Sequence, residues 1–362
     1  MSNNETVYKD LIAFHPGAYV EEIIEDLNIT QQEFSQRLGI SAKTISKLVN
    51  GEESISKETA NKLSKLTGIS IATWLNLQNA YDIKVIEIEE QQKTDEEQLC
   101  NLVDFKYFKE NGFVEKKTYK LKEKIVELRK LLQVSDLSYL YNFNNLVSYR
   151  NTKGFTEKSI VNSNIMLELA INFSKDMTDN KFDKKKLENI LPELRAMTIQ
   201  EPQVFYPILR KKLLECGIVL FGLPALKNAN LNGATKKFKN GSILLLMTDR
   251  NKASDIFWFS LFHEIGHILN NDFYSDHEDS EAYKTKEDKA DKFAQEFLIP
   301  TIDYLKFKQN SKFTQEEIYK FSRELGIHPS IVVGRLQKEG VIDYNGYYNS
   351  FKVKYNIVLN TK

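Results

Sequence analysis

The residues best suited to chemistry in this 362-residue chain lie between Phe257 and Leu269, in one apolar run with helical spacing. The run contains the pattern His263-Glu264-x-x-His267. Residues four apart lie on one side of an α-helix, so the two imidazoles would face the same way. Two neutral imidazoles at this spacing suit Zn²⁺, and a Glu beside the first histidine can act as general base toward an attacking water. The pattern predicts a zinc site with Glu264 as its catalytic base.

A third metal ligand is expected downstream, on a helix predicted over residues 283–298. Glu287 and Asp291 are four residues apart and would share one face of that helix. We expect Glu287 to complete a set of two histidines and one glutamate, and Asp291 to hydrogen-bond the second nitrogen of a ligand histidine. The alternative is a buried helix whose histidines only form hydrogen bonds. Three nearby carboxylates compete with Glu287 as ligands, namely Glu278, Glu281 and Asp288.

The segments that would position this site resemble a compact α+β domain. The predicted elements are a helix over 202–215, a strand over 218–221, strands over 234–238 and 242–247, and the motif helix from about 253. Asn240-Gly241 between the last two strands is a strong hairpin signal. We therefore expect a small antiparallel sheet next to the motif helix, followed by a helical cap at the C-terminal end.

The N-terminal segment carries signals for two short helices joined by a tight turn. Thr30, with Glu33 three residues later, is a capping signal that opens a helix over 31–38. Gly39 ends this helix, and Ser41 caps the next one. This arrangement predicts a helix-turn-helix unit. Its expected core residues are Phe34, Leu38, Ile40, Ile45 and Leu48. The side chains expected to reach DNA are Gln31, Lys43, Thr44, Ser46, Lys47 and Asn50.

The charge of the N-terminal segment limits how it would bind DNA. Residues 1–85 hold eight Lys or Arg residues against eleven Asp or Glu residues, a formal charge of −3. One such module would bind DNA weakly, since phosphate contacts by basic side chains supply most of the affinity. We therefore expect a homodimer to be needed for useful affinity. The competing interpretation is a helix-turn-helix used only for protein contacts.

We expect three regions and a mainly α fold with a small antiparallel sheet. These are a helix-turn-helix domain over 1–85, a helical connector over 86–197, and a domain containing the metal motif over 198–362. The connector should hold helices near 115–133, 136–149, 156–174 and 183–197. The acidic stretch at 89–97 could link domains.

Composition excludes several classes of protein. Lys plus Arg and Asp plus Glu number 50 each, so no global electrostatic partner is implied. The two cysteines, Cys100 and Cys216, form no CxxC pair, which favours reduced thiols in the cytoplasm. The first residues lack the apolar core of a signal peptide, and no apolar run approaches eighteen residues. We expect a cytoplasmic protein with no membrane partner.

The N-terminal motifs resemble those of HigA-type antitoxins, which belong to the phage-repressor-like (XRE) helix-turn-helix class. The resemblance rests on His15-Pro16-Gly17, on the two helix segments described above, and on Trp74-Leu75-Asn76-Leu77-Gln78. It covers nearly seventy residues. The resemblance implies binding to an operator, and a cognate toxin as partner.

The C-terminal motifs resemble those of the ImmA/IrrE metallopeptidases. The resemblance rests on Asn232-Gly233-Ala234-Thr235, on the motif helix, and on the segment from Glu287 to Pro300. It implies that His263, His267 and Glu287 hold zinc, and that Glu264 is the base. Asp291 stands where this family often has Asn. His277 and Tyr304 are open candidates for stabilising an oxyanion, and His328 is expected to be structural.

Together these motifs predict a DNA-binding zinc endopeptidase that cleaves a repressor or a similar regulatory protein. The alternative is a HigA-like antitoxin or transcriptional regulator whose metallopeptidase-like domain senses a signal or binds a partner without proteolysis. In either case we expect DNA as one partner and a protein, a repressor or a cognate toxin, as the other.

Overall fold

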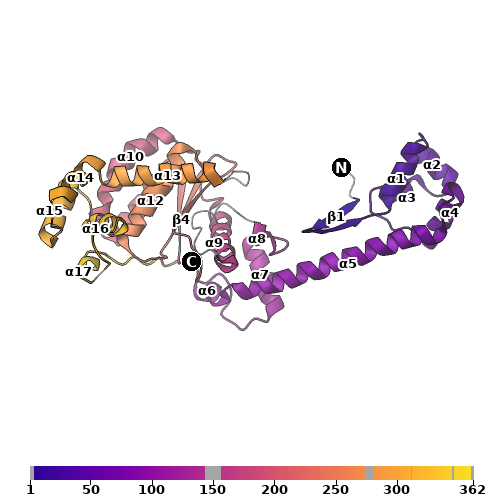
Figure 1. Ribbon diagram of the computed structural model, residues 1–362, viewed down its shortest axis with the longest axis horizontal. Coiled ribbons are helices and arrows are strands. Elements are labelled where there is room, and N and C mark those ends of the chain that lie inside the picture. Colours follow the sequence, from indigo (N-terminus) through magenta and orange to yellow (C-terminus); the bar gives the residue numbers. More distant parts are fainter. Residues whose placement is uncertain (1–3, 143–155, 274–279, 311, 345, 360–362) are drawn as a thin grey trace. The chain divides into compact units, whose positions relative to one another are not determined.

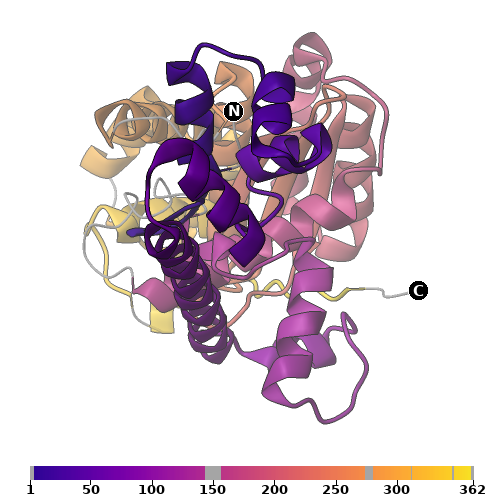
Figure 2. The same ribbon diagram turned by 90° about the vertical axis from the view of Figure 1, so that its right-hand side faces the viewer.

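The computed structural model describes residues 4–142, 156–273, 280–310, 312–344 and 346–359 of the chain. It divides into two compact units, Met1–Glu97 and Gln98–Lys362 (Figure 1), and Figure 2 shows the same elements after a turn of 90°. The first unit has one hydrophobic core, and the second has a core on each face of its sheet. The fold is mainly helical with small sheets, as predicted.

The first unit contains the predicted helix-turn-helix. Its helices are α1 (Gly17–Asp26), α2 (Gln31–Leu38), α3 (Ala42–Val49), α4 (Lys57–Thr67) and α5 (Ile71–Leu102), the last of which continues past the end of the unit. Thr30 Oγ1 accepts the Glu33 N–H at 3.1 Å, and Ser41 Oγ accepts the Thr44 N–H at 3.0 Å. Gly39, at φ +66°, ends α2 in the left-handed region that glycine adopts at little cost. Four of the five predicted core residues are buried, while Ile40 is half-buried at the edge.

An N-terminal hairpin precedes these helices and was not predicted. Strand β1 (Glu5–Tyr8) pairs antiparallel with β2 (Leu11–Phe14). The turn places Lys9 at φ +51°. Asp95 of α5 accepts hydrogen bonds from the Tyr8 hydroxyl at 2.7 Å and from Lys9 Nζ at 2.6 Å. The hairpin is thus anchored to a helix that lies some 85 residues further along the chain.

The acidic stretch at residues 89–97, interpreted as a link, lies inside α5 as continuous helix. It contains no Gly or Pro, and its Glu, Gln and Lys residues are good helix formers. A polar composition therefore did not mean an irregular segment here.

The second unit begins with the helices predicted as a connector. They are α6 (Phe105–Glu110), α7 (Leu121–Leu132), α8 (Tyr139–Asn142), α9 (Glu157–Ser174), α10 (Lys184–Ala196) and the short 3₁₀ turn η2 (Met197–Ile199). The helix predicted over 136–149 is described only as far as Asn142, and its remainder lies outside the described residues. The remaining helices are α11 (Pro202–Glu215), α12 (Ser254–Asn270), α13 (Ser280–Leu298), α14 (Thr301–Asn310), α15 (Gln315–Leu325), α16 (Pro329–Lys338) and α17 (Gly346–Asn349).

The sheet of the second unit is mixed rather than wholly antiparallel, which corrects the prediction. Its order is β3 (Ile218–Leu223), β5 (Ile243–Thr248) and β4 (Gly233–Lys237). Strands β4 and β5 are antiparallel neighbours joined through Asn240-Gly241, as the hairpin signal indicates, with Gly241 at φ +90°. Strand β3 instead pairs in parallel with the other edge of β5. Sequence patterns identified the three strands but could not show which edge of β5 the first one joins.

Strand β5 is buried on both faces, and its side chains alternate between two cores. Ile243, Leu245 and Met247 pack with residues of α10, α11, α12 and α16. Leu244 and Leu246 point the opposite way, toward residues of α6, α7 and α9. Of the connector helices, α6, α7 and α9 therefore cover one face of the sheet, and α10 packs on the other face together with α12. Among the described residues, no helix is long and apolar enough to cross a membrane.

Candidate functional site

Helix α12 places both motif histidines in the interior of the second unit. His263 and His267 are 1% and 3% exposed, and their Nε2 atoms lie 3.0 Å apart. The ring of Phe259, one turn earlier, is 6.4 Å from that of His263. The helical spacing of four residues thus brings the two imidazoles together, as the sequence pattern predicts.

Helix α13 brings Glu287 to the same point. Its carboxylate oxygens lie 3.4 Å from His263 Nε2 and 3.2 Å from His267 Nε2. One candidate ligand atom from each of the three residues can be chosen so that all lie within 4.8 Å of one another. Among the competing carboxylates, Asp288 and Glu281 are exposed and stand outside this group. Glu278 and His277 lie outside the described residues.

Asp291, one turn after Glu287, approaches the outer nitrogen of His263. Its Oδ1 lies 2.7 Å from His263 Nδ1. A carboxylate at this distance favours a proton on Nδ1, so that Nε2 is unprotonated and offers the lone pair that can ligate a metal ion. The Lys338 ammonium of α16 lies 4.0 Å from the other Asp291 oxygen. The four residues that the sequence assigned to metal binding and its support therefore meet in one place.

Glu264 directly follows His263 in α12 and is 1% exposed. Its Oε2 is buried and has no hydrogen-bond partner among the described residues. A Cβ atom built on Gly233 of β4 would come within 2.8 Å of Glu264 Cγ and 3.0 Å of Oε1. Only glycine at position 233 therefore leaves this carboxylate its present room. The Asn232-Gly233 motif is visible in the sequence, but the sequence does not indicate that Gly233 contacts Glu264.

A second glycine sets the distance between the two helices of the site. A Cβ atom on Gly266 would lie 3.2 Å from both Ala290 Cα and Phe293 Cδ1 of α13. Because glycine has no side chain, α12 and α13 approach closely, and Glu287 reaches the imidazoles. Small residues at positions 266 and 290 allow α12 and α13 to pack closely, and no short sequence motif indicates this contact.

The donor set fits a metal ion. Two imidazoles and one carboxylate, all buried, are a common set of protein ligands in catalytic zinc sites. A buried anionic carboxylate is costly without a compensating cation. The buried Glu264 oxygen beside the group also lacks a protein partner within the described residues. The His263, His267 and Glu287 group can therefore hold a metal ion.

The other described histidines have structural surroundings. His15 Nδ1 accepts the Gly17 N–H at 3.0 Å, and burial lowers the pKa of His15 below its ordinary value, against the opposing effect of Asp82. His328 caps α16 by accepting the Ser330 N–H at 3.2 Å, and burial likewise lowers its pKa.

The hydroxyl of Tyr304, an open candidate for stabilising an oxyanion, donates to Glu339 at 2.9 Å. Burial, reinforced by the Glu339 carboxylate, raises the pKa of Tyr304. This hydroxyl is therefore engaged within the helical cap of the second unit.

In the first unit, the residues predicted to reach DNA lie on and beside α3. Gln31, Lys43 and Asn50 are exposed, whereas Ser46 and Lys47 are half-buried. Lys43, Ser46, Lys47 and Asn50 follow the i, i+3, i+4, i+7 spacing of one helix face. Thr44 is also half-buried, and its hydroxyl lies 2.9 Å from Ser41 Oγ, within the cap of α3.

These two sites define a class of protein: a DNA-binding regulator joined to a metallopeptidase-like domain. The helix-turn-helix family model HTH_3 matches residues 20–74, and the Peptidase_M78 model, described as an IrrE N-terminal-like domain, matches residues 224–337. The chain belongs to the helix-turn-helix family of transcriptional regulators and carries an IrrE N-terminal-like domain. The resemblances to the helix-turn-helix class and to IrrE-like metallopeptidases are thereby confirmed.

Known relatives match the N-terminal segment. The uncharacterized HTH-type transcriptional regulator YddM of Escherichia coli strain K12 is 38% identical over 72 residues, which cover 20% of this chain and 77% of that protein. Virulence-associated protein I of Dichelobacter nodosus is 30% identical over 83 residues, covering 23% and 77%. A solved structure of an addiction module antidote protein of the HigA family from Coxiella burnetii has 32% identity, covers 23% of this chain and 91% of its own, and superposes with a TM-score of 0.22.

Proposed function

We propose that this helix-turn-helix regulator is a zinc-dependent endopeptidase that cleaves a repressor or a similar regulatory protein to control gene expression. The observation that carries the proposal is the buried group of His263, His267 and Glu287 with Glu264 beside it. A structural helix pair would have no need to gather two imidazoles and two carboxylates in its interior, because burying such groups is unfavourable.

Three residues would hold the zinc ion, namely His263, His267 and Glu287. Asp291 would orient His263 through the 2.7 Å contact at Nδ1. When bound, zinc supplies Lewis acidity, which lowers the pKa of a water and polarises a peptide carbonyl. With three protein ligands, one position remains for water or substrate, as in other catalytic zinc sites.

Glu264 would move the protons. Its Oε2, which has no hydrogen-bond partner within the described residues, would accept a proton as the water oxygen bonds to the carbonyl carbon. It would then return that proton to the amide nitrogen as the carbon–nitrogen bond breaks. The products are one new carboxylate and one new amine. Gly233 would leave Glu264 the room that it occupies, because a Cβ at position 233 would come within 2.8 Å of Glu264 Cγ.

The helix-turn-helix would place this activity at an operator. Lys43 of α3 and Asn50, directly after that helix, are exposed, and they would contact phosphates or base edges. The acidic balance of the first unit makes binding by a single copy weak, so a homodimer on two half-sites is part of the proposal.

Substitution of Glu264 by Gln tests the proposal. Glu264→Gln removes the base while keeping the shape, so cleavage should fall by about 10²-fold or more while zinc content stays unchanged. The substrates to test are any repressor or small toxin found to be encoded by a neighbouring gene, incubated with zinc-loaded protein and examined by mass spectrometry for one cut. Glu316→Gln, at an exposed glutamate of α15, is the matched control and should cleave normally.

Two results would contradict this function. Normal cleavage by Glu264→Gln would show that Glu264 is not the general base. A stable complex with the small toxin, without any cut and with zinc bound, would favour the antitoxin alternative instead.

A further inference from the structure

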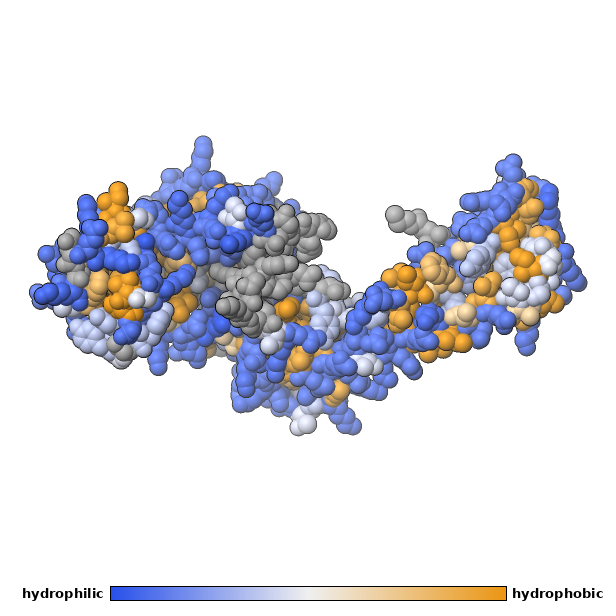
Figure 3. Space-filling model, in the orientation of Figure 1, coloured by the Kyte–Doolittle hydropathy of each residue, from blue (hydrophilic) through white to orange (hydrophobic). Residues whose placement is uncertain are grey.

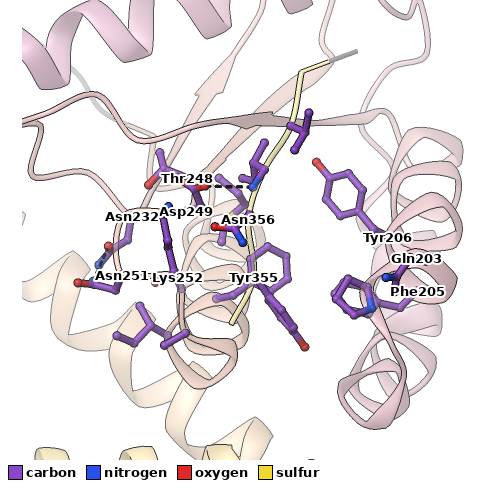
Figure 4. Close-up of a pocket in the computed structure, with 18 residues that line it drawn as sticks. Gln203, Phe205, Tyr206, Asn232, Thr248, Asp249, Asn251, Lys252, Tyr355 and Asn356 are labelled. Atoms are coloured by element: carbon purple, nitrogen blue, oxygen red, sulfur yellow. Dashed lines mark hydrogen bonds between the residues drawn. The ribbon is translucent and has the colours of Figure 1, made fainter. Parts of the chain in front are cut away.

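A cavity of about 310 Å³ lies in the second unit, between α11, the end of β5 and the first half of α12 (Figure 4). Its walls include the apolar side chains of Phe205, Met247, Ile256 and Phe257. In Figure 4, Phe205 and Tyr206 of α11 lie on one side of the C-terminal segment, and Asn232 and Asn251 lie on the other. The lining thus combines apolar side chains with polar ones, among them Thr248 and Asp249.

This cavity leads to the same surface of α12 that carries the proposed base. Ile256 and Ser260 line the cavity, and Glu264 follows at the same spacing of four residues. Each such step is about 6 Å along a helix axis. Asn232, at the opposite wall, directly precedes Gly233, whose backbone packs against Glu264. Ser260 on one wall therefore lies one helical turn before Glu264, and Asn232 on the other directly precedes the glycine that contacts it.

The distance of about 6 Å along α12 between Ser260 and Glu264 fits a peptide in an extended conformation. Such a chain advances about 3.3 Å per residue, so a side chain one or two residues from a carbonyl lies about 3–7 Å away along the chain. A peptide whose carbonyl lies beside Glu264 would bring a nearby side chain to the turn of α12 that holds Ser260. Ser260 lines the cavity and is small, so it takes up little of the space at this turn.

The charges around the cavity disfavour a cationic side chain. Along the described lining, the charged residues are Asp249 and Lys252. The two Asp249 oxygens accept the Ala225 N–H at 2.7 Å and the Ile357 N–H at 3.0 Å. This carboxylate is therefore engaged by the backbone and is poorly placed to pair with an incoming Lys or Arg. Burying an unpaired charge is unfavourable, whereas an apolar group gains from leaving water.

The C-terminal segment completes the cavity wall. The Tyr355 N–H donates to the Lys252 carbonyl at 3.1 Å, and its hydroxyl accepts from Trp258 Nε1 at 3.3 Å. Tyr355 and Ile357 both line the cavity. The walls are thus supplied by segments a hundred residues apart and held in place by hydrogen bonds.

We propose that this cavity receives a large apolar side chain of the protein substrate, close to the peptide bond that is cut. The inference rests on the proposed peptidase function and adds a substrate preference to it. Phe, Leu or Met beside the scissile bond should be favoured over Ala, and over Lys or Arg.

A binding experiment tests the cavity without catalysis. N-acetyl-phenylalaninamide and N-acetyl-alaninamide are titrated separately into the full chain and followed by NMR of the isoleucine and methionine methyl groups. We expect the phenylalanine derivative to bind on the order of tenfold more tightly. Ile256→Trp fills the cavity and should abolish this preference. Ile208→Trp, at a 42% exposed position of α11 outside the lining, should retain it. Equal binding of the two probes, or a preference that Ile256→Trp leaves intact, would overturn the inference.

A cleavage experiment then connects the cavity to the reaction. The zinc-loaded chain is given a peptide library, and the cut positions are identified by mass spectrometry. We expect cuts beside large apolar residues, and a shift toward small residues with Ile256→Trp at unchanged zinc content. Cuts without such a preference would overturn the inference and leave the peptidase function standing. Absence of all cleavage, with the phenylalanine derivative still bound, would reject the peptidase function and keep the cavity as a site for apolar side chains.

Discussion

The two functional regions of this chain differ in where their working side chains lie. Lys43 of the short helix α3 and Asn50 at its end are exposed, whereas His263 and Glu264 of α12 are 1% exposed. An exposed contact is made partly in water and contributes modestly, so several such contacts share the work. A buried ligand or base has no substitute, because neighbouring groups are fixed around it.

The two regions should therefore tolerate amino-acid substitutions very differently. In the first unit, a substitution on α3 should weaken binding by degrees. In the second, a substitution of one group in the site should remove the function, and even a neighbouring glycine should matter.

The largest effect is expected from the metal ligand on α13. Glu287→Ala removes one of three donors, so zinc should be lost and cleavage should disappear, while DNA binding stays unchanged. Asp288→Ala is the matched control, since Asp288 is the adjacent exposed carboxylate and should keep its metal. Elemental analysis of both purified variants measures the zinc content of each. If Glu287→Ala retains zinc and Asp288→Ala loses it, the third ligand is Asp288 and our assignment of Glu287 is wrong.

The next effect concerns the glycine behind the base. Gly233→Ala adds a methyl group 2.8 Å from Glu264 Cγ, so the carboxylate or the strand must move. Such overpacking costs about 1–3 kcal/mol, and we expect at least a tenfold loss in kcat/KM with zinc retained. Gly346→Ala is the control, because a Cβ there meets nothing within 4 Å. Unchanged kinetics in Gly233→Ala would show that Glu264 adapts, and would weaken the contrast between the two regions.

A smaller effect is expected at a buried charge of the first unit. Burial acts to raise the pKa of Asp95, but hydrogen bonds from Lys9, Tyr8 and Gln91 outweigh it, so the pKa lies below its ordinary value. The stabilisation is therefore present above about pH 4 and is lost as pH falls through the lowered pKa. Asp95→Asn should destabilise the chain by about 1 kcal/mol at pH 7.

Denaturant unfolding of Asp95→Asn at several pH values measures this effect. The difference from the natural chain should shrink below pH 4. Glu89→Gln, at an exposed glutamate of the same helix, should show no comparable difference. A difference that stays constant down to low pH would mean that the carboxylate charge is not what anchors the hairpin.

The smallest effect is expected on α3. Lys43→Ala should weaken DNA binding several-fold, and should lower the slope of log affinity against log salt by about one. Fluorescence anisotropy with operator DNA at several salt concentrations provides the slope. Lys320→Ala, at an exposed lysine of α15, serves as control. Complete loss of binding in Lys43→Ala would mean that this exposed helix depends on one residue as strictly as the metal centre does.

The sequence by itself determined the features whose signals lie within a few residues of one another. Thr30 and Ser41 cap the helices that they were predicted to cap, because a cap needs only the next turn of backbone. His263 and His267 face one side because helix geometry alone relates them. The strands around Asn240-Gly241 were identified for the same reason.

Only the tertiary structure decided the features that join distant segments. The N-terminal hairpin rests on Asp95, and the parallel pairing of β3 with β5 turns the expected antiparallel sheet into a mixed one. Gly233 meets Glu264 across thirty-one residues of sequence, and the apolar cavity needs the C-terminal segment as a wall. Such contacts depend on how elements pack, and packing is set by the whole core rather than by any short pattern. The metal-binding motif could therefore be predicted from its own residues, but the space around it could not.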